Sequence, residues 1–211
     1  MAVSFDAAFG AQLDLLLRWR RDVRQFRSDP LPEGTLEALV ERACLAPSVG
    51  NSQPWRFVAV ESPERRAAIR AEFEACNAAA LTSQPAERAE AYAALKLAGL
   101  VEAPVHLAVF CDETTEAGHG LGRATMPETL RASAMGAVFA LWLAARARGI
   151  GVGWVSILRA DRLAEILAVP EGWSLVAYLC IGYPDAEDDT PELERRGWQG
   201  PDAAARVIAR R

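Results

Sequence analysis

The chain has 211 residues, of which 51% are hydrophobic and 24% are charged, and its formal net charge at pH 7 is −5. This length and balance predict a single ordered domain over residues 1–211 with a sizeable core. The negative charge excludes a nucleic-acid partner held by bulk electrostatics, so a bound phosphate would need a local cluster of cations.

The few histidines and the spread of the cysteines argue against a metal site. The chain has two histidines, lacks an HExxH pattern, and has four cysteines spaced too widely for a CxxC pair. Cys44, Cys111 and Cys180 lie in apolar runs and are predicted to be small core residues of a reduced, cytoplasmic protein. We expect no membrane partner, because no apolar run reaches the roughly 20 residues of a membrane span, and no signal-peptide layout is present.

The first predicted element is a helix over residues 6–21, capped by Asp6. It leads into Arg20-Arg21-Asp22-Val23-Arg24, which holds three arginines in five residues. If the helix continues, Arg20 and Arg24 share one face. Arginine forks match phosphate oxygens, so the segment could bind an anion. On its own, however, such a cluster is more often a solvated helix end.

A second helix is expected over about 33–45, followed by the loop Ala46–Trp55 and a strand over 57–60. Pro47 and Pro54 restrict the loop backbone, whereas Gly50 permits unusual dihedral angles. Two interpretations stay open for this loop: a rigid binding loop, or a plain connection from helix to strand.

Residues 63–99 are rich in alanine and predicted to be helical, with a break at Thr82–Pro85 that gives two helices. Their weak apolar pattern indicates a lid over something else. A strongly apolar run predicts a buried strand over 103–111. The glycines in the loop 112–127 fit neither the P-loop nor the GxGxxG pattern.

A long helix is predicted over 128–148, and its many small residues favour a central or dimer-interface helix as much as a plain buried one. A strand over 149–157, a helix over 161–167 capped by Asp161, and a strand over 175–182 follow. Beyond them lies an extended C-terminal tail, 185–211. The resulting fold class is α+β, with a sheet of about four strands covered by helices.

The Arg20–Phe26 segment, the loop Ala46–Trp55 and the strand that ends at Cys111 occur in an order that resembles the nitroreductase-like flavoprotein family. The resemblance covers residues 15–200. It implies a mainly antiparallel sheet of four to five strands flanked by helices, and a homodimer with FMN at the subunit interface. The FMN-binding residues that it implies are Arg20, Arg21, Asp22, Val23, Arg24, Ser48, Lys96, Val155 and Ser156.

Asp22, the run Gly151–Ile157 and the late Gly197-Trp198 resemble one branch of that family, in which reduced FMN is the substrate. The resemblance implies that reduced FMN is fragmented with O2 to 5,6-dimethylbenzimidazole, the lower ligand of cobalamin, and erythrose 4-phosphate. Asp22 would then be the catalytic acid or base and Ser156 a catalytic positioning group. A closed lid implies that a separate flavin reductase supplies FMNH2. The chain departs from the branch in lacking a Gln-Asn pair before Leu141-Trp142.

Three other functions stay open. The chain could be an NAD(P)H-dependent nitroreductase or flavin reductase, which would need an open face above the flavin. It could be a flavin-binding protein without catalytic activity. It could also be a structural module, which would leave the arginines Arg20–Arg24 without a ligand.

Overall fold

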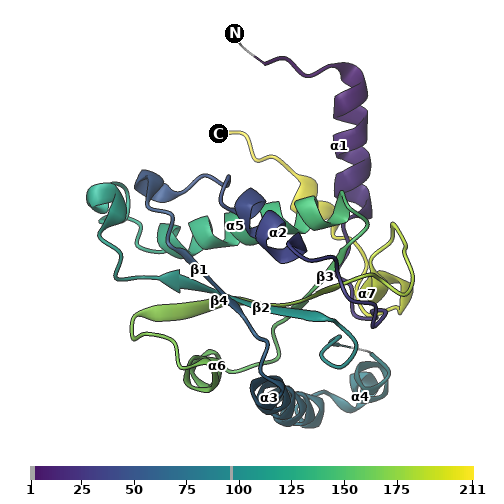
Figure 1. The fold of residues 1–211 in the computed structure, drawn as a ribbon. Helices are drawn as coiled ribbons and strands as arrows, with labels where there is room; N and C mark the ends of the chain where they lie inside the picture. Colours follow the sequence, from purple (N-terminus) through teal and green to yellow (C-terminus); the bar gives the residue numbers. More distant parts are fainter. Residues whose placement is uncertain (1–2, 96) are drawn as a thin grey trace.

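A four-stranded antiparallel sheet forms the centre of the computed structural model, which describes residues 3–95 and 97–211 (Figure 1). The strand order is β1-β2-β4-β3, so β1 and β3 are the two edges. The central strands are almost wholly buried because helices cover both faces of the sheet. The strands are β1 Trp55–Ala59, β2 Val105–Asp112, β3 Gly151–Val155 and β4 Trp173–Gly182.

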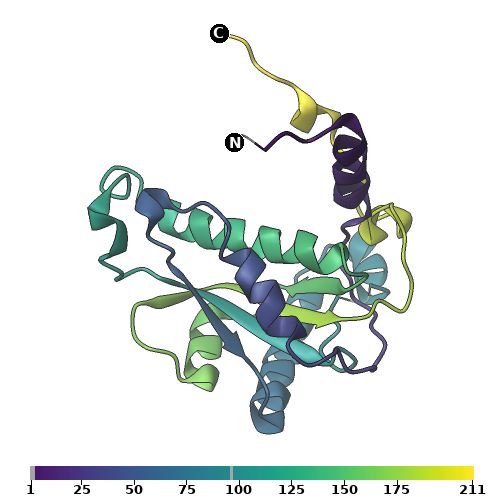
Figure 2. The ribbon, with the colours of Figure 1, turned by 45° about the horizontal axis from the view of Figure 1, so that its top comes forward.

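Helices α2 (Thr35–Ala43) and α5 (Thr129–Arg146) cover one face of the sheet. Figure 2 shows α2 crossing over α5. Eight residues of α5 are buried, and three of them are alanine, whose small side chains let α2 approach closely. Helix α5, for which the sequence favours a central or dimer-interface helix and a plain buried helix equally, is buried in the core of the chain.

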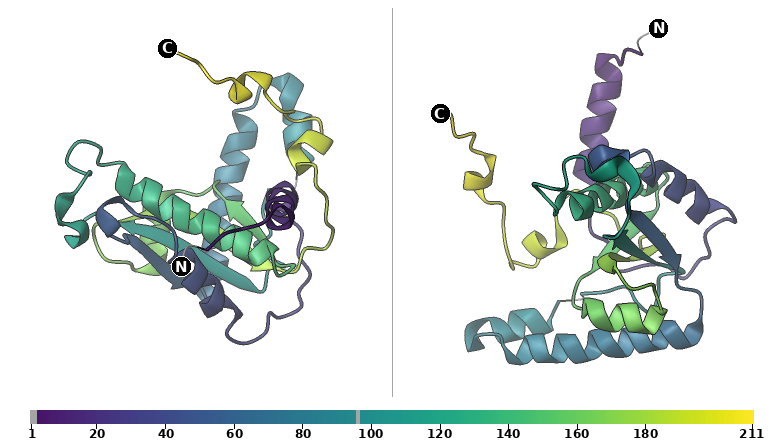
Figure 3. Two further views of the ribbon diagram at one scale, coloured as in Figure 1. Left: turned by 90° about the horizontal axis from the view of Figure 1, so that it is seen from above. Right: turned by 90° about the vertical axis from the view of Figure 1, so that its left-hand side faces the viewer.

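Helices α3 (Pro63–Thr82) and α6 (Ala160–Leu167) cover the other face, with α4 (Ala86–Ala93) beside α3 (Figure 3). The break predicted at Thr82–Pro85 is the turn between α3 and α4. Between these helices and the sheet lies a second hydrophobic core, called the lower core below, in which Ile69 of α3 and Leu163 of α6 are fully buried.

Helix α1 (Ala7–Trp19) stands away from the sheet (Figures 1 and 2). The Asp6 side chain caps it by accepting a hydrogen bond from Phe9 N at 2.8 Å, as predicted. None of its residues is buried, and the apolar Phe9 and Leu13 are 43% and 40% exposed. The C-terminal tail also extends outward, and it contains only α7 (Glu192–Arg195) and the short 3-10 helix Ala203–Arg206. Over the described parts of the chain, each helix is too short or too polar to cross a membrane.

The predicted order of helices and strands is confirmed, but three local predictions are wrong. The helix predicted over residues 6–21 does not include Arg20 and Arg21: it ends at Trp19, and Asp22 forms a parallel bridge with Val152. Asp161 does not cap α6, because Arg159 is at the N-cap position and Asp161 lies inside the first turn. Cys44 is exposed because the buried stripe of α2 runs through Leu39 and Ala43, and the next residue turns away from it.

His106 on β2 and Tyr178 on β4 form a polar pair inside the lower core. His106 Nδ1 and the Tyr178 hydroxyl share a hydrogen bond of 2.8 Å, and both side chains are buried. Burial, and to a smaller degree the positive charge of Arg66, lowers the pKa of His106 to about 4. In the folded protein His106 is therefore neutral at physiological pH.

We predict that His106 lowers the free energy of unfolding in mild acid. The unfolded chain binds a proton near pH 6.5 and the folded chain only near pH 4, so stability falls as pH drops through this window. The full loss corresponds to about 3 kcal/mol. Urea unfolding from pH 7 to pH 4 should show a weaker pH dependence for His106→Gln than for the unchanged protein. His119→Asn, at an exposed position, is the control, and an equal slope in both variants would contradict this prediction.

Candidate functional site

The open edge of β3 organises the arginine-rich segment. An edge strand has backbone groups that need partners outside the sheet. Here the Val152 carbonyl accepts a hydrogen bond from Val23 N at 3.0 Å, and Trp154 N donates to Asp22 Oδ1 at 2.9 Å. Asp22 and Val23 therefore attach to β3 through one main-chain and one side-chain hydrogen bond.

Glycine in β3 makes this attachment possible. A Cβ atom on Gly153 would lie 2.0 Å from the Val23 carbonyl oxygen, and one on Gly151 would lie 2.8 Å from the Val23 side chain. Real atoms do not approach so closely, so the Gly151-Val-Gly153 pattern is required by the segment that lies against it.

Arg24 has an unused hydrogen-bond donor inside the protein. Its Nε donates to Asp22 Oδ2 at 2.8 Å, and its side chain is only 13% exposed. Its Nη1 is buried and has no hydrogen-bond partner among the described residues. A buried donor left unpaired costs about 1–3 kcal/mol, so an acceptor from a ligand would be favoured here.

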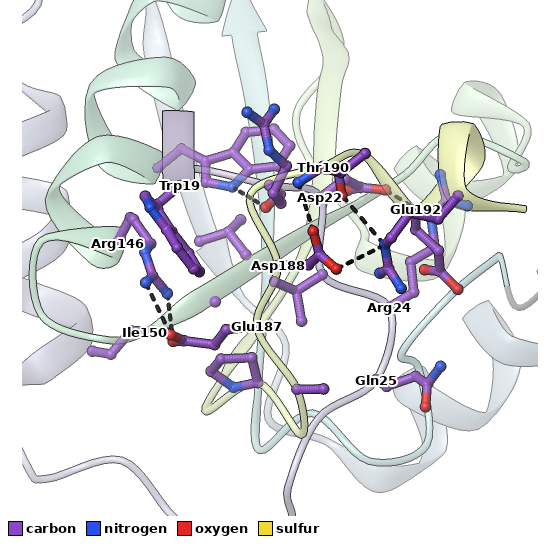
Figure 4. Close-up of a pocket in the computed structure, with 18 of the residues that line it drawn as sticks. Trp19, Asp22, Arg24, Gln25, Arg146, Ile150, Glu187, Asp188, Thr190 and Glu192 are labelled. Atoms are coloured by element: carbon purple, nitrogen blue, oxygen red, sulfur yellow. Dashed lines mark hydrogen bonds and ion pairs between the residues drawn. The ribbon is translucent and has the colours of Figure 1, made fainter. Parts of the chain in front are cut away.

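A cavity of about 140 Å³ lies between this segment, the end of α5, the start of β3 and the C-terminal tail (Figure 4). Figure 4 shows Asp22, Arg24 and Asp188 on its wall. Four of its arginines form ion pairs: Arg24 with Asp22, Arg146 Nη2 with Glu187 at 3.0 Å, Arg195 with Asp188 at 3.2 Å, and Arg196 with Glu192 at 3.7 Å. The arginines that line the cavity are Arg21, Arg24, Arg146, Arg195 and Arg196.

Arg195 and Arg196 were not among the predicted site residues. Only their basic character, next to each other in the tail, indicated them in the sequence. The tail runs back to the Arg20–Arg24 segment: Asp185 N donates to the Gln25 carbonyl at 3.1 Å. This return of the tail brings the late arginines to the early ones.

The three early arginines point to different neighbours. The Arg20 guanidinium lies over the Trp142 ring at 4.9 Å, and burial, followed by the charge of Arg21, lowers the pKa of Arg20. Arg21 Nε donates to the Asp189 carbonyl at 2.9 Å. Arg24 pairs with Asp22. The segment thus places three cations near one corner of the sheet, although Arg20 and Arg24 do not share a helical face because α1 ends at Trp19.

Val155 and Ser156 lie on the same edge as Asp22. Val155 is the last residue of β3 and is buried, and Ser156 follows it with an exposed side chain. Ser156 is two residues past Trp154, whose backbone nitrogen binds Asp22, which is about 7 Å along an extended strand. The structure therefore brings the two predicted catalytic residues to one edge.

Ser48 lies elsewhere in the chain. Its loop is attached to α5, because Val49 N donates to Ser133 Oγ at 3.0 Å, while Ser48 Oγ accepts from Gln53 N at 3.0 Å. On its other side, the loop packs against the loop that contains Gly118. Gly50 and Gly118 both have positive φ angles, and a Cβ atom on either would come within 2.9 Å of the backbone of the other. The loop is thus rigid on both sides.

The sheet register gives the separation of Ser48 from Asp22. The Ser48 loop enters β1 at Trp55, which is level with Ser174 of β4 through Cys111, whereas Val152 beside Asp22 is level with Ile181. Ser174 to Ile181 is about 23 Å along the strand, and β1 to β3 is about 14 Å across the sheet. One chain therefore does not bring Ser48 to Asp22. Lys96, also predicted to bind FMN, lies outside the described residues.

The described part of the chain contains no group of three His, Cys, Asp or Glu side chains arranged as a metal site would require. The acidic residues near the cavity are used in ion pairs with arginine instead, as in Arg146–Glu187 and Arg195–Asp188.

Comparison with known proteins agrees with this architecture. The model of the nitroreductase family matches residues 17–183. The chain is 60% identical to the 5,6-dimethylbenzimidazole synthase of Rhodospirillum rubrum, with 92% of each chain covered. It is 49% identical to a protein of the same name from Rhodobacter capsulatus, with 93% of this chain and 95% of the relative covered.

More distant relatives have other names. A Thermus thermophilus NADH dehydrogenase is 34% identical, with 82% of this chain and 86% of the relative covered. Among solved structures, iodotyrosine deiodinase bound to FMN and 3-iodo-L-tyrosine superposes with a TM-score of 0.73 at 26% identity. That alignment covers 94% of this chain and 97% of the other.

We predict that Gly153→Ala detaches the Asp22–Arg24 segment from β3. The added methyl group would overlap the Val23 carbonyl, and we expect a loss of about 2–3 kcal/mol in the free energy of unfolding, measured in urea. The matched change Gly10→Ala, in a helix position with open space around it, should instead stabilise by about 1 kcal/mol. A neutral Gly153→Ala would mean that the contact is not required.

Proposed function

This chain belongs to the nitroreductase family, and we propose that it fragments reduced FMN with O2 to 5,6-dimethylbenzimidazole, the activity of a 5,6-dimethylbenzimidazole synthase. Three relatives with this name share 46% to 60% identity with it over more than nine-tenths of its length. The observation that carries the proposal at the site is the Asp22 carboxylate, fixed between Trp154 N and Arg24 on the edge of β3.

The residues of the cavity fit the phosphate end of FMN. Arg24 Nη1 lacks a partner in the described residues, and Arg21, Arg195 and Arg196 stand around the same space. Arginine binds phosphate oxygens through charge-assisted hydrogen bonds. The cavity of about 140 Å³ is smaller than the roughly 300–1,000 Å³ of sites that enclose a whole ligand of this size. One chain would therefore hold only part of the molecule.

When bound, reduced FMN supplies both the electrons for O2 and the carbon atoms of the product. Asp22 accepts or gives a proton at a carboxylate oxygen, since breaking carbon–carbon and carbon–nitrogen bonds requires proton transfer. Trp154 N and Arg24 hold its two oxygens in place. Ser156 acts by hydrogen bonding, because no base accepts its proton among the described residues.

A second copy of the chain would complete the site. Ser48 and Asp22 lie at opposite corners of one sheet, so a ligand that contacts both needs the Ser48 loop of another copy. Helix α1 also leaves an apolar groove of about 570 Å³ between Phe9, Leu13 and Trp19. A homodimer covers such a face, which a monomer would leave in water.

Helices α3 and α4 would form the lid. Tyr92 of α4 donates to Asn77 of α3 at 2.8 Å, and Trp198 of the tail packs on Tyr92 and lies beside Arg88. A closed lid excludes water and leaves no room for a nicotinamide. Reduced FMN would thus come from a separate flavin reductase. The four free cysteines suit the reducing cytoplasm.

A second function is favoured by one comparison. The 34% identity to an NADH dehydrogenase keeps open an NAD(P)H-dependent reductase with bound FMN. Such an enzyme would return oxidised FMN intact and consume NAD(P)H.

We predict that Asp22→Asn abolishes formation of 5,6-dimethylbenzimidazole. FMN reduced with dithionite is mixed with the protein without any reductase, air is admitted, and the product is quantified by mass spectrometry. Loss of the proton-transfer group should lower the yield at least about 100-fold. Asp29→Asn, which removes an exposed partner of Arg27, is the matched control and should keep full yield. Quantitative return of FMN from the unchanged protein, with NADPH consumption, would support the reductase instead.

We predict that Leu13→Glu yields a monomer that binds FMN poorly. A charge in the apolar groove of α1 opposes burial against a second copy, and loss of the partner's Ser48 loop removes part of the site. Light scattering after gel filtration gives the mass, and flavin fluorescence gives the affinity, which should fall about tenfold or more. Val101→Glu, at an exposed position outside this groove, should leave both unchanged. A monomeric unchanged protein that binds FMN tightly would contradict the dimeric site.

A further inference from the structure

An ion pair between the buried Glu72 of α3 and the exposed Arg159 links the lid to the connection that follows Ser156. Glu72 of α3 is 8% exposed. Arg159 donates to both of its oxygens, Nε to Oε1 at 2.7 Å and Nη2 to Oε2 at 3.0 Å, and Cys76 Sγ donates to Oε1 at 3.2 Å. The hydrogen bonds from Arg159 hold the pKa of Glu72 at about 2, against the opposing effect of burial. Glu72 is therefore a fixed anion with two oxygens engaged.

The ion pair lies close to Ser156 in the chain. Arg159 is three residues after Ser156 and is the N-cap residue of α6. On one side of Ser156, Val155 is held by its pairing with Tyr178 in the sheet. On the other side, Glu72 holds Arg159. Ser156 thus lies on a short connection fixed at both ends.

The connection has few other restraints. Among the described residues, Ser156, Ile157 and Leu158 make no hydrogen bond outside the sheet, although Leu158 packs on the lower core. The Arg159 side chain is 60% exposed, so without Glu72 it would be free to turn into water. At this end the Arg159 carbonyl accepts a hydrogen bond from Leu163 N at 3.1 Å, so α6 holds the backbone of Arg159 and the Glu72 carboxylate holds its side chain.

A second contact between α3 and α6 supplies a built-in comparison. Arg65 Nη1 donates to the Leu167 carbonyl at 3.3 Å, at the far end of α6 from Ser156. Both contacts attach the lid helix to α6, but only Glu72–Arg159 attaches it beside Ser156. A role in general lid attachment would involve both contacts equally.

We propose that Glu72 and Arg159 are a positioning pair for Ser156, which determines whether reduced FMN is fragmented or merely reoxidised by O2 to FMN and H2O2. The inference rests on the proposed function. Neither residue needs to touch the substrate: Glu72 acts through Arg159, and Arg159 through the short connection to Ser156. A shift of a reacting group's neighbour by about 1 Å can change a rate up to 100-fold.

The test measures the ratio of 5,6-dimethylbenzimidazole to H2O2 per reduced FMN consumed. Glu72→Gln keeps the shape of the side chain and removes its charge, and we expect the ratio to fall about tenfold or more. FMN affinity should change less than about threefold, since the pair lies outside the phosphate cavity. Arg65→Ala and Cys76→Ala, which leave the Glu72–Arg159 pair in place, should retain the ratio of the unchanged protein.

A double-mutant cycle separates this role from a loss of folding. If the pair acts through Ser156, Glu72→Gln combined with Ser156→Ala should be no worse than Ser156→Ala alone. Arg159→Lys, which keeps the charge but loses the two-point contact, is a second variant should Glu72→Gln unfold. Additive losses, or equal losses in Glu72→Gln and Arg65→Ala, would overturn the positioning role.

A second measurement does not depend on turnover. Hydrogen exchange of the backbone amides at 156–159 should be faster in Glu72→Gln than in Arg65→Ala, because only the former frees this connection. If the unchanged protein forms no 5,6-dimethylbenzimidazole, the proposed function fails, and the pair's role in product choice fails with it. If the product forms but exchange and ratio are unaltered in Glu72→Gln, only the positioning pair fails.

Discussion

The attachment of residues 22–24 to the open edge of β3 is the constraint on which the site depends. Two hydrogen bonds fix it, from Val23 to Val152 and from Trp154 to Asp22, and Gly153 provides the space. Because α1 ends only three residues earlier, this attachment also sets where α1 leaves the body. Because the tail returns to Gln25, it sets where the late arginines meet the early ones. The contact between residues 22–24 and β3 thus brings the arginines, the Asp22 carboxylate and the edge of the sheet together.

Electrostatics in this corner follow from that geometry. Several arginines would repel one another in a small space, and the structure offsets this with carboxylates and rings: Arg24 with Asp22, Arg146 with Glu187, and Arg20 over Trp142. The donor left over is Arg24 Nη1, which has no acceptor in the described residues. An anionic ligand would complete a network that the protein leaves one acceptor short.

The sequence predicted what depends on local pattern. Periodicity located the helices and strands, and apolar runs identified β2 and β4 as the buried centre. It failed where the partner is distant in the chain. The pattern places Arg20 and Arg21 inside the first helix, but the helix ends at Trp19 and the following residues pair with β3. The apolar run around Cys44 predicts a core residue, but the direction of α2 leaves Cys44 exposed. The separation of Ser48 from Asp22 follows from strand order, which composition does not encode, and Arg195 and Arg196 join the site only because the tail folds back.

The contact between Gly50 and Gly118 has a consequence for how such a chain can change over time. Each backbone occupies the space that a side chain on the other would need, and both have positive φ angles. A side chain at either position is therefore excluded by two separate causes, strain and collision. Removing only the strain or only the collision would not permit a side chain at Gly50 or Gly118, so a substitution at either position requires both loops to change together. Insertions that remodel the region have to enter outside this crossing point.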